Sequence, residues 1–342
     1  MSRWLACAWA FVVGTAFAGG AHASDRVIVE PAAAEEFVQL PDGVAFPEGL
    51  AVNPSSGELY VATFSFAGNN QLLRFSRQGE LLARRAFGDT PLLGLAYLRG
   101  RLFILNVGAA EVQCIDADFD ATTPVRTVAT IVPADPEVPA TPNDLVFDRG
   151  RDLYISDATQ GAILRVEHPL ARCGKRATTA ETVVQDSLLS STGFPPFGAN
   201  GLALSDDERT LYVANTGDDR ILQVDLNDGT VSVFAESING ADGIVIGPAG
   251  RLWVAANQGD QVVGLDDNGR LVARLGAFLG IRDDGAADGL IFPASVVTYR
   301  HDLFVTNLAL PLTEQTGDEP EEEVTTYTIS RVALPRLPRR GP

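Results

Sequence analysis

One two-strand motif recurs six times along this 342-residue chain and limits the folds open to it. Each copy alternates small and bulky apolar residues, breaks at Gly, Pro, Asn or Asp, and resumes as a second strand, which is the pattern of a β-hairpin. A third strand follows each hairpin, and in the clearest copies a fourth. The copies read EGLAVNPSSGELYVAT, LGLAYLRGRLFILN, NDLVFDRGRDLYISD, NGLALSDDERTLYVANT, DGIVIGPAGRLWVAAN and ASVVTYRHDLFVTN. Four short strands repeated at this spacing predict an all-β fold, a six-bladed β-propeller with four antiparallel strands per blade.

The length of the chain agrees with one propeller. Six blades of roughly 50 residues need about 300 residues, so we expect a single domain over residues 24–342. A ring closes when its last blade takes a strand from the other terminus. We expect TTYTISRVAL to be the third strand of that blade and part of Val27–Leu40 to be the fourth. A helical pattern competes only at the N-terminus and over Ala180–Ser190.

The first 23 residues have the pattern of a secretory signal peptide. Arg3 precedes an apolar run from Leu5 to about Ala18, and Ala21-His22-Ala23 offers a small-x-small cleavage site. The alternative, an uncleaved membrane anchor, is weaker because the run is shorter than the ~20 residues that a span needs. We therefore expect an exported protein, periplasmic or secreted, with no membrane contact after cleavage.

Charge and residue counts exclude several function classes. The net charge of −18 argues against nucleic acid and anionic membranes as partners. Lys175 is the single lysine, and neither His168 nor His301 has Cys or His neighbours, so neither Schiff-base chemistry nor a zinc site is expected. After signal cleavage two cysteines remain, Cys114 and Cys173. An oxidising compartment permits their pairing, but two reduced thiols are equally compatible with the sequence.

At one fixed position of the repeat, four of the six copies carry a side chain with an oxygen that could bind a ligand. Its six residues are Glu48, Leu93, Asn143, Asn200, Asp242 and Ala294. Equivalent residues at the start of the innermost strands form a ring at one mouth of the central channel, so the four oxygen-bearing side chains should converge. Turn formation explains a single Asn or Asp before a strand, but not three of them together with a Glu in one column. Two carboxylates and two amides offer only hard oxygen donors, so Glu48, Asn143, Asn200 and Asp242 predict a divalent metal site, most simply for Ca²⁺.

At these residues the chain resembles a known family. The motifs are Pro47-Glu48-Gly49, Asn143-Asp144 with DRGRDLYISD after it, Asn200-Gly201-Leu202-Ala203-Leu204-Ser205 with RTLYVANT, and Asp242-Gly243 with GRLWVA. They are similar to the four metal-site motifs of the senescence-marker-protein, gluconolactonase and luciferin-regenerating-enzyme family. The resemblance implies a six-bladed propeller with a central calcium or other divalent ion that hydrolyses lactones or esters. It also implies that the four residues are metal ligands and that Asp242 is the general base or the nucleophile.

Two departures from the family pattern bear on the substrate. The sugar-lactonase branch usually has Pro after Glu-Gly and Arg two residues before the middle Asn, where this chain has Leu50 and Thr141. That arginine helps to bind polar sugar lactones, so its absence argues against an aldonolactone. Asp144 follows a ligand and should point the other way along a strand, so we expect it to support a ligand rather than to act in catalysis.

Loops over the mouth should select the substrate. The longest expected loops are Asp116–Thr141 and Glu167–Ala199, and the second contains Phe194 and Phe197 shortly before Asn200. These aromatics either line a substrate pocket or pack the loop onto its blade. An apolar wall would suit a hydrophobic lactone or aryl ester better than a sugar.

The sequence thus predicts an exported metal-dependent hydrolase with a small-molecule lactone or ester substrate. A different class remains open, because NHL-type propellers share the NTGDDRIL-like turn and serve as non-catalytic platforms for proteins or ligands. Such platforms do not need the four-residue ring. A quinone-dependent dehydrogenase is a further alternative, but it would need a catalytic His and a set of cations that the chain does not clearly offer.

Overall fold

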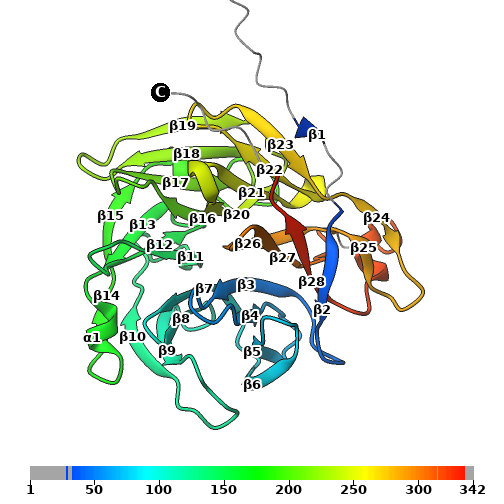
Figure 1. Ribbon diagram of the computed structural model, residues 1–342. Helices are drawn as coiled ribbons and strands as arrows, with labels where there is room; N and C mark the ends of the chain where they lie inside the picture. Colours follow the sequence, from blue (N-terminus) through cyan, green and yellow to red (C-terminus); the bar gives the residue numbers. More distant parts are fainter. Residues whose placement is uncertain (1–27, 30–32, 314, 336–342) are drawn as a thin grey trace, which may run out of the picture.

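Six small antiparallel sheets are arranged around a central axis in the computed structural model, which describes residues 28–29, 33–313 and 315–335 (Figure 1). The expected six-bladed propeller is confirmed. Blade 1 comprises β3 (Pro47–Val52), β4 (Leu59–Thr63), β5 (Asn70–Phe75) and β6 (Leu81–Gly88). Blade 2 comprises β7 (Leu92–Leu98), β8 (Arg101–Asn106), β9 (Glu111–Asp116) and β10 (Arg126–Thr130), with β14 (Thr178–Thr179) added at its edge. Blade 3 comprises β11 (Pro142–Phe147), β12 (Leu153–Asp157), β13 (Ala162–Val166) and β15 (Glu181–Gln185).

The second half of the ring repeats the plan. Blade 4 comprises β16 (Ala199–Leu204), β17 (Thr210–Asn215), β18 (Arg220–Asp225) and β19 (Val231–Glu236). Blade 5 comprises β20 (Ala241–Ile246), β21 (Leu252–Ala256), β22 (Gln261–Leu265) and β23 (Leu271–Leu275), with β1 (Ile28–Val29) at its edge. Blade 6 comprises β26 (Pro293–Tyr299), β27 (Asp302–Asn307), β28 (Thr328–Ala333) and β2 (Glu35–Gln39). Outside the blades lie a hairpin of β24 (Phe278–Ile281) and β25 (Ala287–Gly289), helix α1 (Pro169–Arg172), and the 3₁₀ turns η1 (Ser187–Leu189), η2 (Pro248–Gly250), η3 (Asn257–Gly259) and η4 (Pro320–Glu323).

The ring closes as predicted. β28 is the third strand of blade 6, and β2, from the other end of the chain, pairs with it in antiparallel register. Arg331 Nη2 and Glu35 Oε2 form an ion pair across this junction at 2.9 Å. The signal peptide predicted for residues 1–23 lies outside the described residues. Within the described ranges, no helix is long and apolar enough to cross a membrane.

Two local expectations were wrong. Residues 180–190 do not form a helix, because this segment supplies β15, the outer strand of blade 3, and then turn η1. Likewise, the two long stretches expected as loops contain outer strands: β10 lies in 116–141, and β14 and β15 lie in 167–199. Sparse apolar residues are typical of outer strands, which bury little, so their sequence resembles that of a loop. In blade 1, for example, every residue of β4 is buried, whereas those of β6 alternate between exposed and half-buried.

The hydrophobic core is divided among the interfaces between neighbouring blades. Between blades 1 and 2, Tyr60 and Leu72 pack against Leu102 and Ile104, and comparable clusters fill the other interfaces around the ring. Since each blade is held on both faces, removing apolar surface from water stabilises the closed ring as a whole. The innermost strands thereby become a rigid frame around the channel.

Two of the blade interfaces have an additional short pair of parallel strands, here called a clasp. β14, from the connection between β13 and β15, crosses to blade 2 and pairs in parallel with β10. Beside it, a disulfide joins Cys114 on β9 to Cys173 just after α1, which resolves the cysteine state that the sequence left open. At the interface of blades 5 and 6, β1 pairs in parallel with β23 before the chain continues into β2.

Candidate active site at the mouth of the channel

The repeat position singled out in the sequence is the second residue of the innermost strand in every blade. The pairing of each innermost strand with its neighbour shifts register at that point, for example between Pro47 and Leu50 and between Ala241 and Ile244. All six innermost strands share this irregularity. A bulge re-aims a side chain away from the regular ladder. Five of the six residues line one pocket, and the sixth, Ala294, packs in an apolar cluster beside it.

Close approach of the innermost strands explains the glycine that follows most ring residues. A Cβ added to Gly49 would lie 2.0 Å from Leu93 O, and one added to Gly201 would lie 2.3 Å from Asp242 O. Blade 3 has Asp144 at this place instead. Its Oδ2 accepts a hydrogen bond from Leu202 N of blade 4 at 2.8 Å, so it links the two blades beside the channel.

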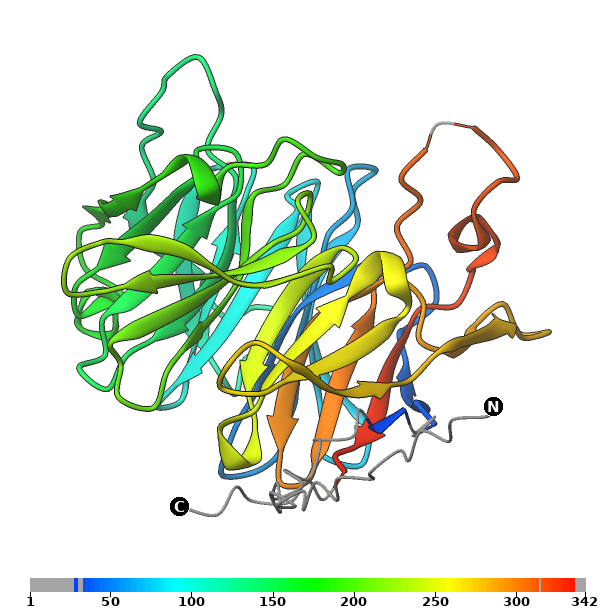
Figure 2. The same cartoon turned by 90° about the horizontal axis from the view of Figure 1, so that it is seen from above.

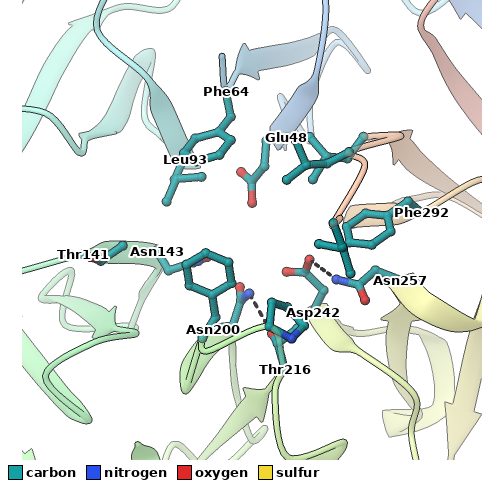
Figure 3. A pocket seen from close by; sticks show the side chains of 15 residues that line it. Glu48, Phe64, Leu93, Thr141, Asn143, Asn200, Thr216, Asp242, Asn257 and Phe292 are labelled. Carbon is teal, nitrogen blue, oxygen red and sulfur yellow. Dashed lines mark hydrogen bonds between the residues drawn. The ribbon is translucent and has the colours of Figure 1, made fainter. Parts of the chain in front are cut away.

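The structure brings the four oxygen-bearing residues to the same pocket. Glu48, Asn143, Asn200 and Asp242 are each 4–6 % exposed, and Figure 3 shows Glu48 and Asp242 reaching toward the centre from different sides. Since the innermost strands follow one another around the ring, Glu48 of blade 1 faces Asn200 of blade 4 across the channel. The other two residues flank Asn200 from blades 3 and 5.

Two carboxyl groups, those of Glu48 and Asp242, lie in a pocket whose described lining residues include no Lys or Arg. Burial raises the pKa of Glu48 well above its usual value, and the charges of Asp242 and Asp144 raise it further. Burial raises the pKa of Asp242 to about 7, against the opposing effect of a hydrogen bond from Asn257. Burial also raises the pKa of Asp144 to about 6. These shifts show that ionising the site is costly without a positive partner.

The donor set fits a hard divalent cation. Glu48 Oε2 is buried and has no hydrogen-bond partner, which is costly for a carboxylate oxygen unless it receives a ligand. Nowhere in the described residues do three His, Cys, Asp or Glu side chains gather as a metal site, and the ring differs from such clusters because half of its ligands would be amides. Oxygen-only ligands with two negative charges match the preference of Ca²⁺.

Two residues that the sequence analysis did not single out hold the ring in place. Asn257, directly after β21, donates from Nδ2 to Asp242 Oδ2 at 3.0 Å. Thr216, directly after β17, accepts from Asn200 Nδ2 at 2.9 Å, and both contacts are drawn in Figure 3. A signal for them was available, because both close the repeated motif at one column, where the other blades have Phe64, Val107, Ala158 and Leu308.

Apolar side chains wall the pocket above the ring. It encloses ≈ 480 Å³, counting space open to solvent. The apolar lining residues are Phe64, Leu93, Pro195, Phe197, Phe292, Leu308, Leu310 and Leu312. The leucines of the β27–β28 connection belong to a segment that projects from the same side of the disc as the β10–β11 connection (Figure 2). The two predicted pocket aromatics differ in position: Phe197 lines the pocket, whereas Phe194 does not and is 59 % exposed.

Comparison with known proteins shows what this chain is similar to. The SMP-30/Gluconolactonase/LRE-like region matches residues 109–277, which include three of the four ring residues with oxygen side chains. Lactonase drp35 of Staphylococcus epidermidis is 26% identical over 267 residues, covering 74% of this chain and 75% of its own. Lactonase drp35 of Staphylococcus saprophyticus is 28% identical over 218 residues, covering 54% of this chain and 62% of its own.

Solved structures show the same fold. A luciferin-regenerating enzyme superposes with a TM-score of 0.62 at 17% identity, over 85% of this chain and 92% of that one. Regucalcin from Agrobacterium tumefaciens, described as a calcium-binding protein, superposes with a TM-score of 0.59 at 18% identity, over 90% and 99%. The resemblance predicted from the four motifs is therefore confirmed: the chain is similar to the SMP-30, gluconolactonase and luciferin-regenerating-enzyme-like proteins.

Proposed function

We propose that this protein is an exported, calcium-dependent hydrolase of apolar lactones or esters. The observation that carries the proposal is the convergence of two carboxylates and two amides at the floor of a pocket with apolar walls. The two lactonase relatives support the reaction class. The calcium-binding neighbour supports only the fold, so the choice of metal rests on the oxygen ligands themselves.

Glu48, Asn143, Asn200 and Asp242 would hold the ion. Calcium, when bound, would supply a positive charge that draws electron density from the carbonyl oxygen of the substrate. Asn200 and Asn143 contribute neutral oxygen donors, which keep the net charge of the ligand set at −2. Asn257 fixes Asp242 Oδ2 through its hydrogen bond and so orients the carboxylate.

Asp242 is the candidate base or nucleophile. As a base it would take a proton from water while the water oxygen bonds to the carbonyl carbon; the bond to the ring or ester oxygen then breaks, and that oxygen takes a proton. As a nucleophile its own oxygen would bond to the carbonyl carbon, the bond to the ring or ester oxygen would break, and that oxygen would take a proton from water. The hydroxide left would then cleave the resulting anhydride, which releases the acid and restores the Asp242 carboxylate. Both routes need the ionised carboxylate, which the environment of the metal-free site disfavours because burial raises the pKa of Asp242 to about 7.

The walls of the pocket favour an apolar substrate. Phe64, Phe292 and Leu308 present hydrocarbon surface next to the ring. Thr141 lines the pocket where the sugar-lactonase branch has an arginine, and its hydroxyl accepts a hydrogen bond from Thr159. The pocket thus lacks a cationic group at the place where that branch binds sugar hydroxyls. Removing apolar substrate surface from water supplies the binding energy instead.

Export is supported by two independent features. The N-terminal pattern is typical of a signal peptide, and a disulfide between Cys114 and Cys173 is stable in an oxidising compartment.

Calorimetric titration of calcium into chelator-treated protein starting at Ser24 tests the metal. We expect one-to-one binding, and we expect hydrolysis of an apolar lactone such as a dihydrocoumarin to disappear with chelator and return with calcium. Gluconolactone should be a poor substrate in the same assay. A folded protein that binds no calcium would contradict the proposal and would favour a non-catalytic propeller platform.

A further inference from the structure

The hydroxyl of Thr216 connects the ring residues of two neighbouring blades. Thr216 is 1 % exposed. Its Oγ1 lies 2.9 Å from Asn200 Nδ2 in blade 4 and 2.7 Å from Ala241 O, the backbone carbonyl directly before Asp242 in blade 5. Both distances are those of ordinary hydrogen bonds.

The direction of these two hydrogen bonds follows from elementary chemistry. A hydroxyl has a single proton, and a backbone carbonyl oxygen can only accept. The Thr216 proton must therefore point to Ala241 O, which leaves Oγ1 as an acceptor toward Asn200. Only the NH₂ group of the Asn200 amide can donate to it. The amide oxygen must then face the other way.

We propose that Thr216 is a positioning residue that sets the polarity of the Asn200 amide, so that its oxygen faces the channel. The proposal rests on the proposed function, because this polarity matters only if the ring binds a cation. The Asn200 side chain already interacts with Asp242 and lowers its pKa. Without Thr216, the pull of the Asp242 and Glu48 carboxylates on the NH₂ group of Asn200 would be unopposed. An amide NH₂ cannot ligate a cation, so the turned amide would have to reverse before metal binds.

Blade 5 also has a polar contact at this column, but it is made to a carboxylate. Asn257 occupies the column of Thr216 and contacts the ring residue of its own blade, Asp242. Blade 1, which carries Glu48, has Phe64 at this column, and the Phe64 side chain has no polar atom. A carboxylate has two equivalent oxygens, so its polarity needs no control. Asn143 lies below Ala158, so Thr216 acts on Asn200 alone.

Replacing Thr216 by Val tests the proposal, because Val keeps the shape and removes the hydroxyl. We expect the calcium affinity measured by calorimetry to fall at least about tenfold, since the loss of one buried hydrogen bond favours the turned amide. Thr216→Ser should restore an affinity close to that of the original protein. Thr216→Ala removes the same hydroxyl and serves if the Val variant does not fold.

Thr63→Val is a matched control. Thr63 is also 1 % exposed and pairs with Pro47, directly before Glu48, but the hydrogen bonds of its hydroxyl in the described residues stay within blade 1, from Gln71 N and to Asn70 Oδ1. We expect this variant to lose stability without losing calcium affinity. An equal loss of affinity in Thr63→Val would overturn the proposal, because the effect would then be general destabilisation.

A double-mutant cycle isolates the polarity of the amide. Asn200→Asp replaces the amide by a carboxylate with two equivalent oxygens, so Thr216→Val in that background should change calcium affinity by less than about threefold. The same loss in both backgrounds, or undiminished affinity in Thr216→Val, would overturn the proposal. An original protein that binds no calcium would instead refute the metal site, and this outcome separates the two hypotheses.

Discussion

The two halves of the channel mouth share one backbone arrangement but differ in the polarity of their side chains. Blades 3, 4 and 5, the polar half, place Asn143, Asn200 and Asp242 on the ring, with Thr216 and Asn257 in the column above. Blades 6, 1 and 2, the apolar half, place Ala294, Glu48 and Leu93 on the ring. The column above them in the apolar half is Leu308, Phe64 and Val107. Glu48 is thus the one ring carboxylate set among apolar neighbours.

The two halves differ in their side chains and not in their backbone. Strand order and the bulge at the second residue of the innermost strand are common to all six blades, so they belong to the architecture. The side chains at two columns are not common, and they divide the mouth into a face with oxygen-bearing side chains and a face of hydrocarbon. A substrate with a carbonyl at one end and an apolar body would satisfy both faces at once.

Removing Asp242 from the polar half should have the largest effect on lactone hydrolysis. For Asp242→Ala we expect lactone hydrolysis to fall by about 10³-fold or more, because the variant loses both a charged ligand and the proposed base or nucleophile. Hydrolysis should be followed by pH-stat, with circular dichroism to show that the blades remain folded. Hydrolysis that persists within about tenfold would assign the chemistry to another residue.

Phe197 tests the wall that faces the substrate. Because its side chain lines the pocket, Phe197→Ala should lower kcat/KM for an apolar lactone by about 10- to 100-fold. Phe194→Ala is the matched control, since this side chain is exposed and should change kcat/KM little. If the two variants are equally impaired, the loop acts through its packing and not through one aromatic contact.

The repeat made much of the site predictable. Blade number, strand order, the closing strand and the convergence of Glu48, Asn143, Asn200 and Asp242 all follow from one column of an aligned motif. The sequence could not separate Phe194 from Phe197, because the direction of the backbone in the loop decides which ring faces the pocket. Thr216 lay inside the motif, but its role depends on the direction of hydrogen bonds, which no pattern of letters contains.

Burial makes the carboxyl groups of the ring weaker acids than usual. Burial raises the pKa of Asp242 to about 7, and of Glu48 well above its usual value, so both carboxylates must lose protons to bind a cation. Calcium affinity should therefore rise with pH, by about tenfold between pH 6 and pH 8 from the Asp242 proton alone.

The thermal stability of the calcium-free protein should change with pH in the opposite direction to calcium affinity. A carboxyl whose pKa is raised on folding stabilises the folded state at low pH, and this contribution is lost as the pH rises through the folded pKa, here about 7 for Asp242. The melting temperature without calcium should then fall between pH 5 and pH 8, and calcium should restore it. Affinity and melting temperature that do not vary with pH would contradict this account of the ring.

Substitutions where the two halves of the mouth meet should have the smallest effect on lactone hydrolysis. The polar and apolar halves adjoin at the interfaces of blades 2 and 3 and of blades 5 and 6, and these are the interfaces with a parallel strand clasp in the described residues. The Cys114–Cys173 disulfide reinforces the first of them and closes a loop of 59 residues.

Replacing both cysteines by Ser should lower the free energy of unfolding by ~2–4 kcal/mol, because the unfolded chain regains the freedom that the cross-link removes. Lactone hydrolysis at 25 °C should stay unchanged, since neither cysteine lines the pocket. Chemical denaturation and kcat/KM, measured on the same preparation, check both statements. A fall in kcat/KM in a fully folded variant would show that this clasp also sets the spacing between Leu93 and Asn143, and that the two halves of the mouth are not independent.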